Sequence, residues 1–186
     1  MTRADPRHRI WLIRHAPTTW TGRRWCGRAD PPLSTAGRRA AADLARDLGA
    51  KLPGDAVVLT SPARRARATA EAVASRGALE LVVADELLEV DVGRVEGLDW
   101  GELSTLERAT AEAIVGGRPI DWPGGESAVD VDARAQRAAR RVRTAARARP
   151  VVVVSHGAFL AALARALGLP AAGIGMDPCA VVRLDP

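Results

Sequence analysis

The sequence of 186 residues contains only two cysteines, Cys26 and Cys179, and they lie far apart in the chain. They form no C-x-x-C pair and no spacing typical of a metal site, so the sequence predicts neither a disulfide framework nor a zinc site. Long apolar runs are also lacking. After the charged stretch MTRADPRHR, the run IWLI is too short for the core of a signal peptide or for a membrane span. We therefore expect a cytoplasmic protein without a membrane partner.

Lysine and aromatic residues are scarce: Lys51 is the only lysine, tyrosine is absent and there is one phenylalanine. The net charge of +5 therefore comes almost entirely from arginine. A basic chain can bind nucleic acid, but these arginines are scattered along predicted helices such as ARAQRAARRVRTAARAR, with no aromatic residues between them. We expect no nucleic-acid partner, and we attribute local positive charge to a small anionic substrate.

Short apolar runs rich in β-branched residues predict strands that are covered on both faces, as in a parallel sheet. They are IWLI (10–13), AVVLT (56–60) and VVVV (151–154). LELVVA (79–84) is a further candidate, and CAVVRLD near the C-terminus is typical of an edge strand. Helical patterns over 34–52, 61–77, 126–149 and 157–169 separate or follow these strands. The alternation predicts a three-layer α/β/α sandwich with a mostly parallel central sheet.

Helix starts are predicted from capping residues. The N-cap candidates are Ser34, Ser61 and Ser127, because a serine hydroxyl accepts a hydrogen bond from the first turn of a helix. Pro62 would then be the first helical residue after Ser61, and Asp130 follows Ser127 at the spacing of a capping box. With 47% hydrophobic residues, the length suits a single domain over 1–186. Glycines, prolines and two tryptophans interrupt the pattern between 98 and 125, where we expect a small lid insertion.

Polar groups suited to binding phosphate follow the three core strands. They are Arg14 and His15 after the first strand, Ser61 with Arg65 after the second, and Ser155 with His156 after the third. In open α/β sheets, ligands bind at the carboxyl ends of the strands. The chain has only three histidines, and two of them occupy equivalent positions at two strand ends. We therefore expect these groups to meet at one anion site.

Four motifs occur in order along the chain: LIRHAPT, SPARRARATA, LLEVDVGRVEG and VVSHG. Together they resemble the motifs of the histidine phosphatase superfamily, the phosphoglycerate-mutase-like group, and the resemblance extends from residue 11 to residue 157. It implies a phosphoglycerate-mutase-like fold and a metal-independent phosphomonoesterase that acts through a phosphohistidine intermediate. It also implies that neither a metal nor an organic cofactor is needed.

The resemblance assigns roles to five residues. His15 would be the nucleophile that becomes phosphorylated. Arg14, Arg65 and His156 would bind the phosphoryl oxygens, since arginines offer forked donors that stay charged. Glu89 would be the proton donor to the leaving group.

This chemistry sets requirements on two pKa values. The nucleophile His15 has to be neutral, and the two neighbouring arginines should lower its pKa. Glu89 has to be protonated, so its pKa should be raised by desolvation. Asp91 and Glu86 are the rival carboxylates, and we expect a structural role for Glu96.

The phosphate loop departs from the family pattern, because Arg-His-Gly-Glu is replaced by Arg-His-Ala-Pro. Thr21 stands where many members have an asparagine near the phosphate. Thr18, Cys26 and Gly27 are further candidates to bind phosphate through a hydroxyl or backbone N–H groups, and a plain free thiol is the alternative for Cys26. Gly157, directly after His156, completes the candidate phosphate site.

Two further segments bear on the substrate. The segment EGLDWGELSTLERA holds no lysine where mutases of the group use one, which favours a phosphatase over a mutase. RWCGRADPPLSTAG and WPGGES resemble α-ribazole phosphatases, so α-ribazole 5′-phosphate, an intermediate of cobalamin biosynthesis, is a candidate substrate. Trp20, Trp25, Trp100 and Trp122 would suit a flat base or would simply pack the lid. A mutase and a non-catalytic phosphate-ligand binding domain remain alternatives, and a homodimer is left open.

Overall fold

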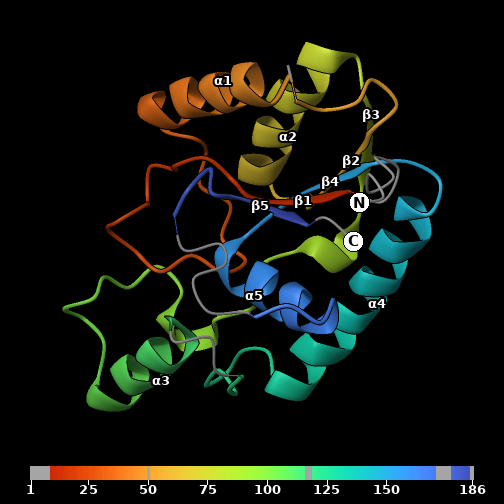
Figure 1. Cartoon of the computed structure of the whole chain (residues 1–186). Helices are drawn as coiled ribbons and strands as arrows, with labels where there is room; N and C mark the ends of the chain where they lie inside the picture. Colours follow the sequence, from red (N-terminus) through yellow and green to blue (C-terminus); the bar gives the residue numbers. More distant parts are fainter. Residues whose placement is uncertain (1–8, 50, 116–118, 171–176, 185–186) are drawn as a thin grey trace.

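A five-stranded sheet runs through the centre of the computed structural model, which describes residues 9–49, 51–115, 119–170 and 177–184 (Figure 1). The strands are β1 (Ile10–Arg14), β2 (Val57–Thr60), β3 (Glu80–Val83), β4 (Val151–Ser155) and β5 (Val181–Leu184). Their order across the sheet is β3-β2-β4-β1-β5. The first four are mutually parallel, and β5 pairs antiparallel with β1 at the edge. The mostly parallel sheet and the C-terminal edge strand are thus confirmed.

Helices cover both faces of this sheet (Figure 1). The described helices are α1 (Thr35–Gly49), α2 (Arg64–Gly77), α3 (Thr105–Val115), α4 (Ala128–Ala146) and α5 (Gly157–Ala166). In Figure 1, α1 and α2 lie above the sheet, whereas α4 and α5 lie below it and α3 stands to one side. The predicted three-layer α/β/α sandwich is confirmed.

The apolar runs of the central strands divide their side chains between two cores. In β1, Ile10 and Leu12 pack with residues of α4 and α5. Trp11 and Ile13 point to the other face and pack with residues of α1 and α2. Because both faces are buried, the first four positions of β1 are all apolar and no alternation appears. Full burial of each such side chain stabilises the fold by about 1.5–3 kcal/mol, which fixes the strand ends that carry the polar groups.

Two of the three predicted N-caps are confirmed. The Ser34 hydroxyl accepts a hydrogen bond from the Gly37 N–H at 2.9 Å and caps α1. The Ser127 hydroxyl accepts one from the Asp130 N–H at 3.1 Å and caps α4. These caps are local, which is why the sequence alone predicts them.

The predicted start of α2 is wrong. The helix begins at Arg64, not at Pro62, and the Ser61 hydroxyl does not cap it. Instead, the carboxylate of Asp30 accepts the Arg64 N–H at 2.9 and 3.1 Å. Ser61 accepts the Ala63 N–H in a turn before the helix, and this leaves its hydroxyl close to the candidate site.

The predicted lid insertion contains one described helix, α3, as expected. Its tryptophans pack against the loop after β1. Trp25 stacks on Trp100, with ring centroids 5.7 Å apart, and meets the edge of Trp122 at 6.0 Å. Trp122 is 3% exposed and belongs to the core, whereas Trp100 is 42% exposed. Packing of the lid therefore accounts for Trp25 and Trp122. Trp100 is partly exposed, and the Arg108 guanidinium lies over its ring at 5.4 Å from the centroid.

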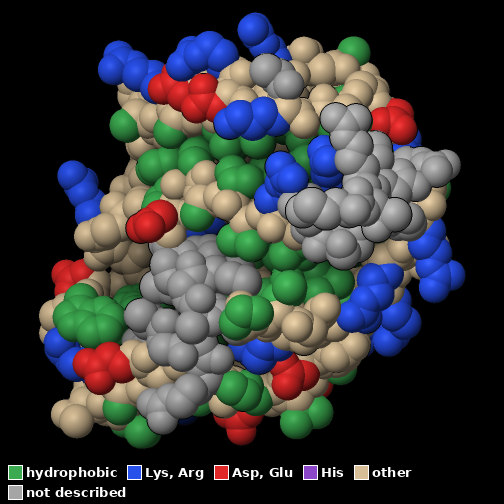
Figure 2. All heavy atoms as spheres, viewed as in Figure 1, with side chains coloured by type: hydrophobic (Ala, Val, Ile, Leu, Met, Phe, Trp, Pro, Cys, Tyr) green, Lys and Arg blue, Asp and Glu red, His purple; other side chains and the backbone are tan. Residues whose placement is uncertain are grey.

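Figure 2 shows the charged surface in the orientation of Figure 1. Basic side chains form several separate groups around this face, with acidic side chains and apolar surface between them. Cys26 and Cys179 are free thiols. Across the described ranges, no helix is both long and apolar enough to cross a membrane.

Candidate active site

The two histidines predicted to meet emerge from neighbouring parallel strands. Arg14 at the end of β1 is paired in register with Ser155 at the end of β4. The next residues, His15 and His156, therefore leave the sheet side by side. Their ring centroids are 5.1 Å apart in an edge-to-face arrangement. The sheet thus brings both imidazoles close enough to contact one phosphoryl group.

Arg65 comes from the first turn of α2 and is 1% exposed. Its Nε donates a hydrogen bond to Nε2 of His15 at 3.2 Å. Its terminal nitrogens donate to the carbonyl of Ala29 at 2.6 Å and to that of Gly27 at 2.8 Å, and Asp30 lies 3.7 Å away as an ion-pair partner. The guanidinium is therefore held rigidly against the candidate nucleophile.

The hydrogen bonds of His15 determine its tautomer. Its Nδ1 lies 2.8 Å from the carbonyl of Ala16, which can only accept, so Nδ1 carries the proton. Its Nε2 faces an Arg65 N–H, which can only donate, so Nε2 carries the lone pair. Ala16 is fixed in turn because its N–H donates to Thr69 Oγ1 at 3.0 Å. The structure thus places the lone pair of His15 on Nε2, which the sequence could not do.

His15 is neutral in this environment. Burial, then Arg65 and Arg14, lower its pKa to about 3, and the hydrogen bond to Ala16 opposes this only partly. The direction agrees with the expectation from the sequence, although burial contributes more than the two arginines. A neutral imidazole with a directed lone pair is the form that attacks phosphorus.

His156 is fully buried and shares a hydrogen bond of 2.8 Å between its Nε2 and the Ser61 hydroxyl. Burial, followed by the charge of Arg65, lowers the pKa of His156 well below its ordinary value. Its Nδ1 is buried and has no hydrogen-bond partner among the described residues. A buried polar atom without a partner is rare, and at an anion site it is a group available to a ligand. The contact with Ser61 was not predicted, although Ser61 opens a motif noted in the sequence.

Arg14 adds a second, partly buried cation. Burial lowers the pKa of Arg14, and the carboxylates of Glu89 and Asp177 oppose that effect. The charge of Arg65 lowers it further. Two guanidinium groups within electrostatic range of each other are stabilised by an anion placed between them.

Glu89 is 7% exposed and has a fixed orientation. Its Oε1 accepts the N–H groups of Val90 at 2.9 Å and Phe159 at 3.0 Å. Burial raises the pKa of Glu89, while these two hydrogen bonds and the charges of Arg65 and Arg14 oppose the shift. Since Oε1 accepts from two donors, Oε2 is the oxygen that can carry a proton. A raised pKa is what a general acid requires.

The rival carboxylates are engaged elsewhere. Oδ1 of Asp91 accepts the Gly93 N–H at 2.9 Å. Glu86 pairs with Arg141 at the surface, at 3.3 Å. The carboxylate of Glu89, in contrast, acts directly on the pKa of Arg14. The structure therefore favours Glu89 over Asp91 and Glu86 as the proton donor.

Thr18 and Thr21 lie in one turn and bond to each other. The Thr18 N–H donates to the Thr21 hydroxyl at 2.8 Å, and the two hydroxyl oxygens are 3.2 Å apart. Thr18 is buried, whereas Thr21 is exposed. Their hydroxyls shape the loop in this structure, so their predicted contact with phosphate remains a prediction.

Cys26 and Gly27, two of the candidates to bind phosphate, make hydrogen bonds within the protein. The Cys26 thiol donates to the Ala29 carbonyl at 3.4 Å, and burial raises its pKa to about 11. It is a protonated thiol, which agrees with the alternative of a plain free thiol. The Gly27 N–H donates to Glu96 at 2.9 Å and is not available to phosphate, so Gly27 contributes its carbonyl to Arg65 instead. Gly157 is the first residue of α5, directly after His156.

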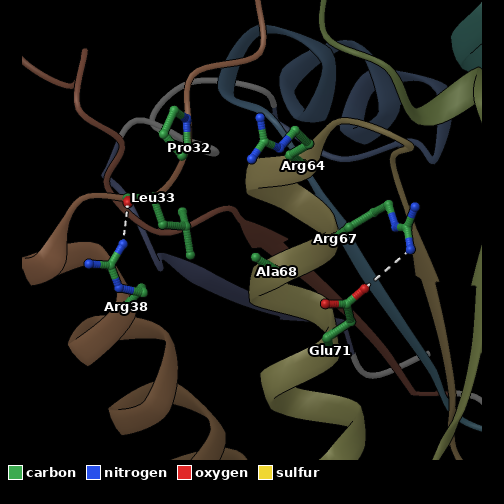
Figure 3. A pocket seen from close by; sticks show the side chains of 7 residues that line it. All are labelled: Pro32, Leu33, Arg38, Arg64, Arg67, Ala68 and Glu71. Carbon is green, nitrogen blue, oxygen red and sulfur yellow. Dashed lines mark hydrogen bonds and ion pairs between the residues drawn. The ribbon is translucent and has the colours of Figure 1, made fainter.

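A separate pocket of about 330 Å³ lies between α1 and α2 (Figure 3). Its lining residues are Pro32, Leu33, Arg38, Arg64, Arg67, Ala68 and Glu71. Two of its arginines are already engaged, Arg38 with the Leu33 carbonyl at 2.9 Å and Arg67 with Glu71 at 3.3 Å. None of the residues around His15 lines this pocket, so it is distinct from the candidate active site.

The fold and the site together define a class of protein: an α/β protein whose strand ends bring together a neutral imidazole, a second imidazole, two arginines and a buried glutamate. The chain matches the model of the histidine phosphatase superfamily (branch 1) over residues 10–186, and it belongs to that superfamily.

Named relatives include both mutases and phosphatases. The chain is 31% identical to a probable phosphoglycerate mutase GpmB of Proteus mirabilis, over 95% of the chain and 84% of that relative. It is 37% identical to the bifunctional protein Rv2228c of Mycobacterium tuberculosis over 80% of the chain, but it spans only 41% of that longer relative. Among solved structures, mycobacterial glucosyl-3-phosphoglycerate phosphatase Rv2419c is similar, with a TM-score of 0.80 and 30% identity over 95% of this chain and 89% of that one.

Proposed function

We propose that the protein is a metal-independent phosphomonoesterase that hydrolyses a small phosphorylated metabolite through a phosphohistidine on His15. One observation carries the proposal: the lone pair of His15 Nε2 lies beside Arg65, in a site with a second, partly buried guanidinium and a second imidazole. Positioning and charge stabilisation carry most of phosphoryl transfer, and these groups supply both.

In the first half of the reaction, the substrate phosphoryl group takes the place between Arg14 and Arg65. A phosphoryl oxygen beside His15 accepts the Arg65 Nε–H in place of Nε2, while the guanidinium stays on the carbonyls of Gly27 and Ala29. The lone pair of His15 is then free to attack phosphorus. The N–P bond forms as the P–O bond to the leaving group breaks. Glu89 donates its Oε2 proton to the leaving oxygen, so an alcohol departs and a carboxylate remains.

In the second half, water attacks the phosphorus of phosphohistidine. The Glu89 carboxylate takes a proton from that water, the N–P bond breaks, and the electron pair returns to Nε2. Inorganic phosphate leaves, and the enzyme regains its neutral imidazole and protonated acid. Ser61 supports this cycle by donating its hydroxyl hydrogen to Nε2 of His156, which leaves the Nδ1–H of His156 to donate to a phosphoryl oxygen.

The substrate class is a phosphate ester of a small metabolite. α-Ribazole 5′-phosphate stays a candidate because of the sequence segments 24–37 and 122–127. Glucosyl-3-phosphoglycerate, named for a structural relative, belongs in the same substrate panel. The free thiols of Cys26 and Cys179 support a reducing compartment such as the cytoplasm.

A phosphoglycerate-type mutase is the second candidate function, because GpmB relatives cover nearly the whole chain. The lack of lysine after residue 97 weighs against it. The two functions differ in the acceptor of the phosphoryl group: water for a phosphatase, a second substrate hydroxyl for a mutase. Release of inorganic phosphate without phosphoglycerate isomerisation supports the phosphatase.

The test is a phosphate-release assay on a panel of phosphorylated metabolites, with and without EDTA and vanadate. Wild type should turn over at least one ester, resist EDTA, be inhibited by vanadate and take up acid-labile phosphate. His15→Ala should lose turnover and labelling, whereas His8→Ala, at a histidine outside the described residues, should retain both. Full activity of His15→Ala would overturn the assignment of the nucleophile. Ligand binding without turnover by wild type would favour the non-catalytic alternative.

A further inference from the structure

Glu96 binds three consecutive backbone N–H groups of a loop that is distant in sequence. Its Oε1 accepts the Gly27 N–H at 2.9 Å. Its Oε2 accepts the Arg28 N–H at 2.7 Å and the Ala29 N–H at 3.0 Å. Successive N–H groups that converge on one carboxylate form a strong anion-binding arrangement. The conformation of loop 27–29 therefore depends on this side chain.

The carbonyl groups of the same loop hold Arg65. Gly27 and Ala29 accept its two terminal nitrogens at 2.8 and 2.6 Å. The N–H side of the loop thus faces Glu96, and its carbonyl side faces the guanidinium. Arg65 in turn places its Nε 3.2 Å from Nε2 of His15. A continuous chain of hydrogen bonds runs from Glu96 to the nucleophile.

The loop has little room on its other side. A Cβ atom added at Gly27 would lie 2.6 Å from the Val90 carbonyl oxygen and 2.9 Å from the Val92 nitrogen. The loop backbone therefore packs directly on the segment that follows Glu89. Without Glu96, the loop would lose three charge-assisted hydrogen bonds. Any displacement of its backbone would also displace the two carbonyls that hold Arg65.

We infer that Glu96 is a positioning residue: by fixing loop 27–29, it holds the Arg65 guanidinium at hydrogen-bond distance from His15 Nε2. The kinetic consequence rests on the proposed function, whereas the placement of Arg65 rests on the geometry alone. A positioning loss of this kind typically costs about 10- to 100-fold in activity.

The kinetic test compares Glu96→Ala with Glu71→Ala, which removes an exposed carboxylate from the helix that carries Arg65. Glu96→Ala should lower kcat/KM about 10- to 100-fold and slow phosphate labelling of His15. Glu71→Ala should stay within about twofold of wild type, because exposed ion pairs contribute little. Glu96→Gln keeps one acceptor oxygen and should fall between wild type and Glu96→Ala. It also serves as the test variant if the alanine variant does not fold.

A second readout needs no activity. The chain has three histidines, so the imidazole ¹⁵N resonances of His15 are assigned with two single substitutions. The charged and titratable groups around His15 are Arg65 from α2, Arg14 from β1 and His156 at the start of α5. At pH 7.5 the Nε2 resonance of wild type should be that of a nitrogen accepting a hydrogen bond. In Glu96→Ala it should shift toward that of a free acceptor, while the Nδ1 resonance stays in place.

The two readouts separate the inference from the proposed function. An unchanged Nε2 resonance in Glu96→Ala overturns the inference, whether or not activity falls. If wild type turns over no ester, the proposed function fails, but the Nε2 shift still decides the role of Glu96. Equal kcat/KM for Glu96→Ala and Glu71→Ala in an active enzyme would also overturn it.

Discussion

Replacing Glu89 with glutamine removes the proposed proton donor and keeps its anchor. Oε1 accepts the N–H groups of Val90 and Phe159 at 2.9 and 3.0 Å, and an amide oxygen can accept both. The amide NH₂ then takes the place of Oε2, with nearly the same volume in a site that is 7% exposed. We therefore expect Glu89→Gln to fold as wild type does and to lack only the transferable proton.

The size of the effect should depend on the leaving group. A positioned general acid contributes about 10²- to 10⁴-fold when the departing oxygen is a strong base. Alkyl phosphates should therefore lose about that factor in Glu89→Gln. p-Nitrophenyl phosphate releases a stable phenolate that needs no proton, so its hydrolysis should fall less than about tenfold.

The assay is kcat/KM for a series of alkyl and aryl phosphates, measured for wild type, Glu89→Gln and the matched control Glu86→Gln. Glu86 pairs with Arg141 at the surface, so its variant should follow wild type across the series. Equal losses of Glu89→Gln on alkyl and aryl esters would refute the role of Glu89 as the acid. A leaving-group-dependent loss in Glu86→Gln would transfer the role to Glu86.

The same substitution has a consequence for stability. Burial raises the pKa of Glu89 in the folded protein. The contribution of this side chain to the free energy of unfolding is therefore fully present below the pKa that Glu89 has in the unfolded chain, and it is lost as the pH rises through the pKa that Glu89 has in the folded protein. Glutamine does not ionise. The Tm of Glu89→Gln should therefore rise relative to the Tm of wild type between pH 4 and pH 7.5. Thermal unfolding monitored by circular dichroism measures this.

Three further predictions concern the residues around the nucleophile. Arg65→Lys keeps the charge, but one ammonium cannot replace hydrogen bonds to two carbonyls and His15. Thermal unfolding should show that the free energy of unfolding falls by about 2–5 kcal/mol. An unchanged Tm would show that the hydrogen bonds of Arg65 do not stabilise the fold. Gly27→Ala places a Cβ 2.6 Å from a backbone oxygen and should lower stability by about 1–3 kcal/mol, whereas Gly54→Ala, with no atom within 4 Å, should not. Because the pKa of His15 falls from 6.5 to about 3 on folding, the contribution of neutral His15 to the free energy of unfolding is lost as the pH falls. His15→Gln should gain about 2 kcal/mol relative to wild type between pH 7.5 and 5 in denaturant unfolding, and a pH-independent difference would show that His15 is not buried as a neutral base.

Much of the fold follows from local patterns. The apolar runs at 10–13, 56–60 and 151–154 predict buried parallel strands, because only strands covered on both faces lack alternation. Ser34 and Ser127 cap their helices through hydrogen bonds to the N–H group three residues further along the chain. The meeting of His15 and His156 also follows once the strands are parallel, since each histidine directly follows a strand end.

The details of the site could not be predicted in this way. Ser61 looks like an N-cap in the sequence, yet its hydroxyl bonds with His156, 95 residues further along the chain. The α2 terminus is bound instead by Asp30, 34 residues earlier. Gly27 offers its N–H to Glu96 rather than to phosphate. In each case the side chain or backbone group bonds to a residue that is distant in the sequence and is brought near only by folding, instead of to the partner predicted from the sequence.

The sequence by itself determined the layered α/β architecture, the strand ends at which polar groups gather and the superfamily to which the chain belongs. Periodicity, capping and motif order act over a few residues, so they are visible in one dimension. Only the tertiary structure decided which nitrogen of His15 carries the lone pair, which carboxyl has its pKa raised by burial and what holds Arg65 in place. Those properties depend on burial and on hydrogen bonds between residues about 35 to 95 positions apart, and both arise only when distant segments pack together.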